Sequence, residues 1–171
     1  MKFAYADPPY LGCGKSHYGH LHSAAAEYDT IEAHSNLVNR LTADYPDGWA
    51  LSCTSGNLHD ILPLCPREAR IGAWTKPFAS FKPGVNPGYC WEPLIWMGGR
   101  KHGKGRPTVR DYCAVNITMK RGFPGAKPEG FCQWVFDLLG AERGDELHDL
   151  FPGSGAVGRA WDAFQSQGVF A

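Results

Sequence analysis

Short apolar segments alternate with amphipathic ones along this 171-residue chain. Segments with the length and composition of buried strands are residues 2–6, 49–53, 70–74, 93–97, 112–117 and 146–151, with the start of another at 169–170. Apolar side chains recur at helical spacing in residues 30–43, with Thr30 as the candidate cap, and in 58–64, with Asn57 as the candidate cap. The same spacing recurs in residues 128–139 and 156–164. This alternation predicts an α/β fold with a mainly parallel sheet and helices on both faces. One domain over residues 1–171 is expected, because a chain of this length can bury one core.

The bulk composition narrows the class of protein. Lys and Arg together number 17, and so do Asp and Glu, so the net charge gives no argument for a polyanionic partner. Six cysteines lie at irregular spacing without a CxxC pair, which predicts free thiols in a reducing, cytoplasmic setting. We expect no signal peptide and no membrane span, since no segment approaches the ~20 apolar residues that a span needs.

The tetrapeptide Asp7-Pro8-Pro9-Tyr10 directly follows the first predicted strand. The prolines fix φ and lack N–H groups, so they end the strand in a rigid turn whose backbone offers acceptors. The Asp7 carboxylate and the Pro8 carbonyl can both accept hydrogen bonds from one exocyclic amino group, which would leave its lone pair aimed at an electrophile. Tyr10 offers a face on which an extruded base can stack. A purely structural turn, with Asp7 capping a backbone group, is the alternative.

A glycine-rich turn follows the last long predicted strand, in the sequence Asp149-Leu150-Phe151-Pro152-Gly153-Ser154-Gly155-Ala156-Val157-Gly158. A GxGxxG pattern between a strand and a helix predicts a cofactor that approaches the backbone and the helix N-terminus closely. A dinucleotide would need an acidic residue about 20 positions further on, whereas 13 residues follow Gly158. We therefore expect a smaller adenosine ligand. A glycine turn with no ligand is the alternative.

Three motifs together carry a resemblance to a known family. Asp7-Pro8-Pro9-Tyr10 resembles the DPPY motif of amino-directed DNA methyltransferases, and residues 149–155 are similar to their FxGxG motif. Lys127-Pro128 resembles the Lys-Pro element that precedes FxGxG in the permuted, beta-class members. The resemblance covers nearly the whole chain. It implies a Rossmann-like S-adenosylmethionine-dependent methyltransferase fold with circularly permuted motif order.

The same resemblance implies the activity and the residues of the site. The reaction would be methyl transfer from S-adenosylmethionine to the exocyclic N6 amino group of adenine in DNA, in a bacterial or virus-infected cell, and it needs no metal. The catalytic turn would be formed by Asp7, Pro8, Pro9 and Tyr10. The cofactor would be bound by Asp7, Lys127, Asp149, Phe151, Gly153, Ser154 and Gly155.

Three other functions stay open. A cytosine-N4 enzyme is one, although such enzymes usually carry Ser in place of Asp7. An RNA adenine methyltransferase is another, because residues 91–97 resemble the Glu-Pro strand of the family related to the mRNA enzymes, which usually carry Trp where this chain has Tyr10. The third is a catalytically inactive nucleic-acid-binding or partner-activating module. It is motivated by the lack of an acidic residue after Phe170, where the family holds the cofactor ribose.

Basic residues in a Gly-rich segment suggest where nucleic acid, double- or single-stranded, would bind. The candidate recognition loop is a short insert at about residues 98–120, so either the specificity is low or a homodimer or separate partner supplies it. We expect nucleic-acid contacts from Tyr10, Lys15, His17, Arg100, Lys101, Lys104 and Arg106. A solvated basic loop is the alternative reading of this charge pattern. The Trp and Phe residues of segment 74–96 are expected in the core rather than on a stacking surface.

Overall fold

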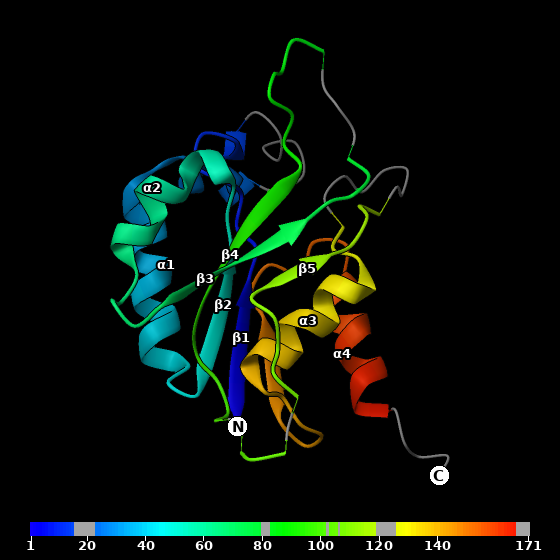
Figure 1. Cartoon of the computed structure of the whole chain (residues 1–171). Helices are drawn as coiled ribbons and strands as arrows, with labels where there is room; N and C mark the ends of the chain where they lie inside the picture. Colours follow the sequence, from blue (N-terminus) through cyan, green and yellow to red (C-terminus); the bar gives the residue numbers. More distant parts are fainter. Residues whose placement is uncertain (16–22, 80–82, 102, 106, 119–125, 167–171) are drawn as a thin grey trace.

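The computed structural model describes residues 1–15, 23–79, 83–101, 103–105, 107–118 and 126–166 (Figure 1). Within these ranges six strands form one sheet in the order β5-β3-β4-β2-β1-β6. The strands are β1 (Lys2–Ala6), β2 (Gly48–Ser52), β3 (Arg70–Thr75), β4 (Trp91–Gly98), β5 (Tyr112–Ala114) and β6 (Glu146–Asp149). The α-helices are α1 (Ile31–Asp44), α2 (Leu58–Ile61), α3 (Glu129–Leu139) and α4 (Ala156–Ser166), and 3₁₀ turns span Ser23–Asp29, Ser55–Asn57 and Leu62–Leu64.

The sheet is mainly parallel, as the sequence predicts. Strand β1 pairs in parallel with both β2 and β6, and β3 pairs in parallel with β5. Strand β4 is the exception, because it runs antiparallel to both of its neighbours, β2 and β3. Antiparallel neighbours need no crossover helix, so the Pro- and Gly-rich segment between β3 and β4 can join them as a long hairpin.

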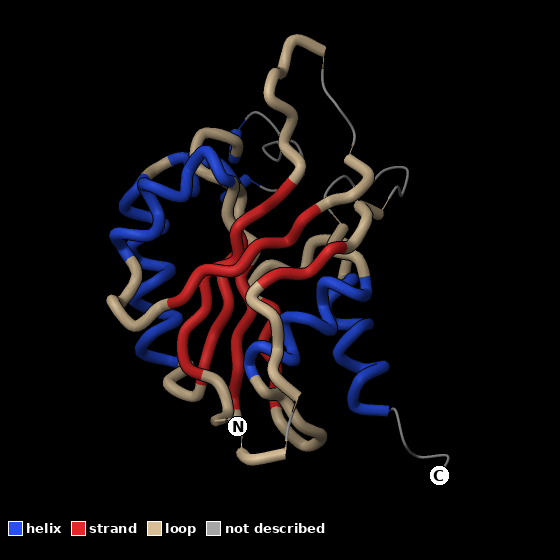
Figure 2. Tube along the Cα trace, in the orientation of Figure 1, coloured by secondary structure: helices blue, strands red, loops and turns tan. Residues whose placement is uncertain are grey.

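Helices cover both faces of the sheet, which confirms the layered arrangement expected from the sequence (Figure 2). Side chains alternate along β1, with Phe3 and Tyr5 in the cluster that contains α3 and α4 residues. Ala4 and Ala6 lie in the cluster that contains α1 and α2 residues. Each longer helix packs one side against the sheet and turns the other outward, which accounts for the helical spacing of its apolar residues. None of the described helices combines the length and apolar character needed to cross a membrane.

The ends of the helices and strands differ from the sequence prediction in two respects. Thr30 caps α1 as predicted, because its Oγ1 accepts a hydrogen bond from the Ala33 N–H at 3.3 Å. Asn57 makes no such bond for α2; Thr54 instead accepts from the Asn57 N–H, one turn earlier. The predicted strands 112–117 and 146–151 are shorter than expected, because the chain turns away after Ala114 and Asp149. Residues 169–170 lie outside the described residues.

Strand direction gives the sheet two chemically different edges. Strands β1, β2, β3 and β6 all end at one edge, here called the carboxyl edge, which is uppermost in Figure 1. Antiparallel β4 ends at the opposite edge, where Gly98 stands beside Gly48. A Cβ on Gly98 would lie 2.8 Å from the Gly48 Cα, and its φ is +74°, so glycine is required for this close approach.

Arg100 has a structural role at this second edge. Its Nη2 donates to both carboxylate oxygens of Asp145 at 2.8 Å, and its Nε donates to the Gly140 carbonyl at 3.1 Å. The Asp145 side chain is only 5% exposed and also accepts from the Met1 ammonium at 2.6 Å. Burial opposes the charge on Asp145, yet the hydrogen bonds from Met1 and Arg100 hold its pKa below the usual range.

Replacing Arg100 by Ala should lower the free energy of unfolding by about 2 kcal/mol, because Asp145 then keeps a buried charge with fewer partners. The difference from the unmodified protein should shrink as the pH falls from about 4, the ordinary Asp pKa, through the lowered folded-state pKa of Asp145, where the carboxylate takes up a proton. Urea denaturation at pH 7 and pH 3 measures both effects. Lys101→Ala is the matched control, since Lys101 is exposed, and it should leave stability unchanged; an equal loss in both variants would refute the structural role.

Candidate active site

The two turns that the sequence singled out lie side by side at the carboxyl edge. Tyr5 of β1 stands opposite Asp149 of β6, and the Leu150 N–H donates to the Tyr5 carbonyl at 2.9 Å. Asp7 follows Tyr5 by two residues, and the glycine-rich turn starts directly after Asp149. Neighbouring parallel strands therefore bring segments 7–10 and 149–155 together, as expected for ligand sites in open α/β sheets.

Tyr10 turns its hydroxyl back toward two carboxylates. The phenol oxygen lies 3.2 Å from Asp7 Oδ1 and 3.1 Å from Glu92 Oε2. A phenol has one proton, so it can donate to only one of these carboxylates at a time. Burial, reinforced by the charge of Asp7, raises the pKa of Tyr10 well above its usual value, so the phenol stays protonated. The tyrosine ring is thus held by its polar end.

Lys127 lies at the centre of this group. Its Nζ is 3.1 Å from Asp7 Oδ1, 3.2 Å from Glu92 Oε2 and 3.3 Å from the Tyr10 hydroxyl, which occupies the three protons of an ammonium group. The side chain is only 6% exposed, and the rings of Trp74 and Phe131 lie 5.5 and 5.7 Å from the cation. Burial opposes its charge, but the nearby acidic groups, Asp7 first, raise the pKa of Lys127 well above its usual value.

Glu92 is the site residue to which the sequence assigned no role. It stands opposite Trp74 in the β3–β4 pairing, and its second carboxylate oxygen forms an ion pair with Lys76. Burial would raise its pKa, but the two lysines outweigh burial, so the pKa of Glu92 is lowered. The signal that could have revealed it is a carboxylate at the second position of an otherwise apolar strand, Trp-Glu-Pro-Leu-Ile-Trp.

One oxygen of the Asp7 carboxylate is engaged inside the cluster. Oδ1 lies 3.1 Å from Lys127 Nζ and 3.2 Å from the Tyr10 hydroxyl, and the side chain is 23% exposed. Burial raises the pKa of Asp7 and Glu92 adds to this, whereas Lys127 counteracts both by favouring the charged form. An ionised carboxylate with an available oxygen at the mouth of a buried cluster can accept a hydrogen bond from an incoming N–H group.

The glycine-rich turn has the form needed for a closely approaching ligand. Gly153 and Gly155 have φ of +45° and +69°, and the nearest atom to a Cβ on Gly153 would be 3.8 Å away. Asp149 Oδ1 accepts from the Phe151 N–H at 3.3 Å. Burial raises the pKa of Asp149 to about 6, the Phe151 hydrogen bond opposes this, and the charge of Asp7 adds to it. The two acidic residues are therefore electrostatically coupled.

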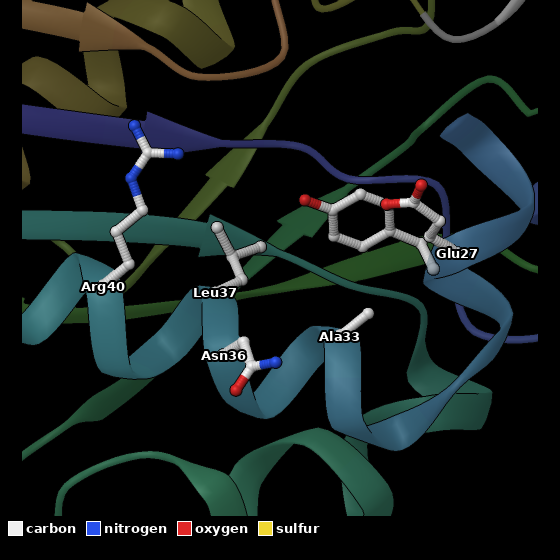
Figure 3. Close-up of a pocket in the computed structure, with 6 residues that line it drawn as sticks. Glu27, Ala33, Asn36, Leu37 and Arg40 are labelled. Atoms are coloured by element: carbon white, nitrogen blue, oxygen red, sulfur yellow. The ribbon is translucent and has the colours of Figure 1, made fainter. Parts of the chain in front are cut away.

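A hollow of about 260 Å³ is lined by α1 and the 3₁₀ turn that precedes it (Figure 3). Its lining consists of Glu27, Tyr28, Ala33, Asn36, Leu37 and Arg40. The Tyr28 ring contacts the Phe151 ring edge to face, with centroids 5.2 Å apart, so the hollow borders the turn. Its lining therefore includes a carboxylate, an amide and a guanidinium as well as an aromatic ring.

The expected nucleic-acid contacts do not form one surface. Tyr10 and Lys15 lie in the segment that follows β1 at the carboxyl edge. The segment with Arg100, Lys101 and Lys104 instead follows β4 at the opposite edge, beside the N-terminus in Figure 1, and Arg100 is engaged by Asp145. His17 and Arg106, like the other loop histidines His20 and His22, lie outside the described residues. Within the described part, no three His, Cys, Asp or Glu residues form a group suited to a metal ion.

Comparison with known proteins shows which solved structures share this fold. No family model matches the sequence, and no curated protein matches it. Among solved structures, the chain is similar to the crystal structure of the M1.HpyAVI-SAM complex, with a TM-score of 0.62 and 14% identity over 96% of this chain and 79% of that chain. The crystal structure of M1.HpyAVI gives a TM-score of 0.58 and 12% identity over 96% and 76% of the two chains. This chain has the fold of M1.HpyAVI. The α/β fold predicted from the sequence, with a mainly parallel sheet and helices on both faces, is thereby confirmed, and the permuted motif order stays a prediction.

Removing the central cation should unbalance the buried group. Lys127→Met leaves Asp7 and Glu92 with one buried cation fewer, and the free energy of unfolding should fall by about 3 kcal/mol at pH 8. The loss should be smaller at pH 5, because the folded-state pKa values of the carboxylates rise in the variant and protonation then stabilises it. Urea denaturation at the two pH values tests this. Lys15→Met is the control, and a loss independent of pH would contradict the assignment.

The coupling of the two turns is open to direct titration. The Asp149 carboxyl should titrate near pH 6 in carbon-detected NMR, and Asp7→Asn should lower that pKa because a neighbouring negative charge is removed. Asp137→Asn, on the exposed part of α3, should leave the Asp149 titration unchanged. An identical titration in the Asp7→Asn protein would show that the two turns are not adjacent.

Proposed function

We propose that this chain is an S-adenosylmethionine-dependent methyltransferase that methylates the exocyclic N6 amino group of adenine in DNA. The observation that carries the proposal is the meeting of Asp7 and Asp149 on neighbouring strands, in a fold similar to that of the M1.HpyAVI-SAM complex. The three motifs contribute their chemistry at this one edge, in the order of the permuted class. The proposal also implies a cytoplasmic setting, where DNA and cofactor meet.

The residues of the second turn fit the proposed cofactor. S-adenosylmethionine would supply an activated methyl group on its sulfonium. Backbone N–H groups at the start of the 11-residue helix α4, with two glycines before it, can receive its methionine or adenosine part without a steric clash. Binding would involve Asp7, Lys127, Asp149, Phe151, Gly153, Ser154 and Gly155. The carboxylate of Asp149 would provide an acceptor for its ammonium group, with the charge of Asp7 close by.

The first turn would orient the amine. Asp7, through the oxygen that Lys127 does not contact, and the Pro8 carbonyl would accept the two N–H bonds of the adenine amino group. The nitrogen lone pair then points toward the methyl carbon; the N–C bond forms as the S–C bond breaks, and the methylated amine afterwards loses a proton to water. Lys127 favours the charged form of Asp7 that this requires. Rate enhancement would come from positioning.

Tyr10 would receive the extruded base. Its hydroxyl is anchored by Lys127 and one carboxylate, so the ring is held in place before the base arrives. Base extrusion costs a few kcal/mol, and stacking on one aromatic ring returns ~1–3 kcal/mol. Pro9, between the acceptor carbonyl and the ring, keeps the turn rigid.

One observation favours a second candidate, adenine in RNA. Glu92 begins the strand that resembles the mRNA-type enzymes, and it contacts both Tyr10 and Lys127. Digestion of methylated DNA and RNA to nucleosides, followed by mass spectrometry, identifies the base and the nucleic acid. N4-methylcytidine products would instead indicate the cytosine activity.

Replacing Asp7 by Ala should lower methyl transfer at least about 100-fold, because the amine loses one of two positioning acceptors. Binding of S-adenosylmethionine, measured by calorimetric titration, should weaken less than about tenfold, since the glycine-rich turn remains intact. Asp44→Ala, on the exposed surface of α1, is the control for both measurements.

Two results would overturn the proposal in different ways. Full activity in Asp7→Ala would remove the catalytic assignment of the first turn. No heat of S-adenosylmethionine binding to the unmodified protein would identify the chain as an inactive module that keeps the fold, which binds nucleic acid or activates a partner.

A further inference from the structure

The hairpin that joins β3 to β4 exposes three aromatic side chains. Phe78, Tyr89 and Trp91 are 55%, 61% and 38% exposed, whereas Trp74 and Trp96 of the same hairpin are 3% and 5% exposed. Thus the expectation that the Trp and Phe residues of segment 74–96 belong to the core is right for Trp74 and Trp96 and wrong for Phe78 and Trp91, while Phe81 lies outside the described residues. The hairpin extends beyond the carboxyl edge, as the green loop at the top of Figure 1 shows.

The hairpin is joined to the candidate site at its base. Lys76, the first residue after β3, forms an ion pair with Glu92, and its N–H donates to the Cys90 carbonyl at 2.8 Å. Glu92 in turn contacts Tyr10 and Lys127. The exposed rings are therefore carried by a segment whose two legs are held by the same buried charges that hold the Tyr10 hydroxyl.

We propose that Phe78, Tyr89 and Trp91 form a stacking surface for the bases that flank the target nucleotide in a single or locally opened nucleic-acid strand. The inference rests on the proposed function. Extruding a base unstacks its neighbours, and exposed aromatic faces at the entrance to the site can replace the lost stacking. Every base has a π-face, so such a surface binds with little sequence preference, in keeping with the shortness of the insert at 98–120.

The position of the rings favours nucleic acid over a protein partner. A flipped base must enter at the carboxyl edge, where Asp7 lies, and flanking nucleotides then necessarily pass close to the segments that project from that edge. The basic segment with Arg100, Lys101 and Lys104 follows β4 at the opposite edge and is poorly placed to contact those nucleotides. The aromatic hairpin fills the role that the sequence had given to that loop.

Binding of a fluorescein-labelled 12-nucleotide single strand with one central adenine, followed by anisotropy, tests the surface. Phe78→Ala, Tyr89→Ala and Trp91→Ala should each weaken binding at least about fivefold, and the triple variant at least about 100-fold, from the lower limit of base–aromatic stacking. Ile71→Ala, near the start of β3, and Tyr112→Ala, on β5, remove exposed side chains away from the loop that joins β3 to β4, and each should change the affinity less than twofold. S-adenosylmethionine binding should be the same in all variants, which shows that they are folded.

The outcomes separate this inference from the proposed function. Strand affinity that is unchanged in the triple variant, or absent from the unmodified protein, overturns the stacking surface. A triple variant that changes a dimer into a monomer without loss of strand binding assigns the hairpin to a protein interface, and also overturns it. If the single strand binds through the three aromatic residues but S-adenosylmethionine does not bind, the stacking surface is supported and the proposed methyl transfer is refuted.

Discussion

A buried lysine between two carboxylates is the interaction on which the candidate site depends. Lys127 has almost no access to water, so its charge is stable only because Asp7 and Glu92 surround it. The carboxylates in turn tolerate burial only because the ammonium, together with Lys76, balances them. The three elements that supply these groups, the β1 turn, the start of β4 and the segment before α3, are thereby fixed relative to one another.

This charge balance explains how a rigid turn can hold a free acceptor. One oxygen of Asp7 is engaged by Lys127 and Tyr10, which fixes the orientation of the carboxylate. Because these contacts hold Oδ1, they also fix the direction in which the second oxygen of Asp7 points. Such preorganisation lowers the free energy needed to rearrange the site during the reaction, because the partners are already in place before a substrate arrives.

Features set by neighbouring residues could be predicted from the sequence, whereas contacts between residues far apart in the sequence could not. The Thr30 cap and the apolar runs of the strands act within a few residues, so their sequence pattern sufficed. The reversed direction of β4 leaves no such pattern, because an apolar run reads the same in either direction. Lys127 and Arg100 have partners, Asp7 and Asp145, that are far away in the sequence, and only the folded chain shows them paired.

The pairing of β1 with β6 has a consequence for how the site comes into being. Lys2 pairs with Glu146, so this contact closes a loop that contains most of the chain. The β3–β4 hairpin involves near neighbours and can form early, whereas closing a loop of that size is slow. The aromatic hairpin can thus be present on a growing chain, but the turns after β1 and β6 meet only when the last strand docks. Ligand binding at their junction would report the completion of folding.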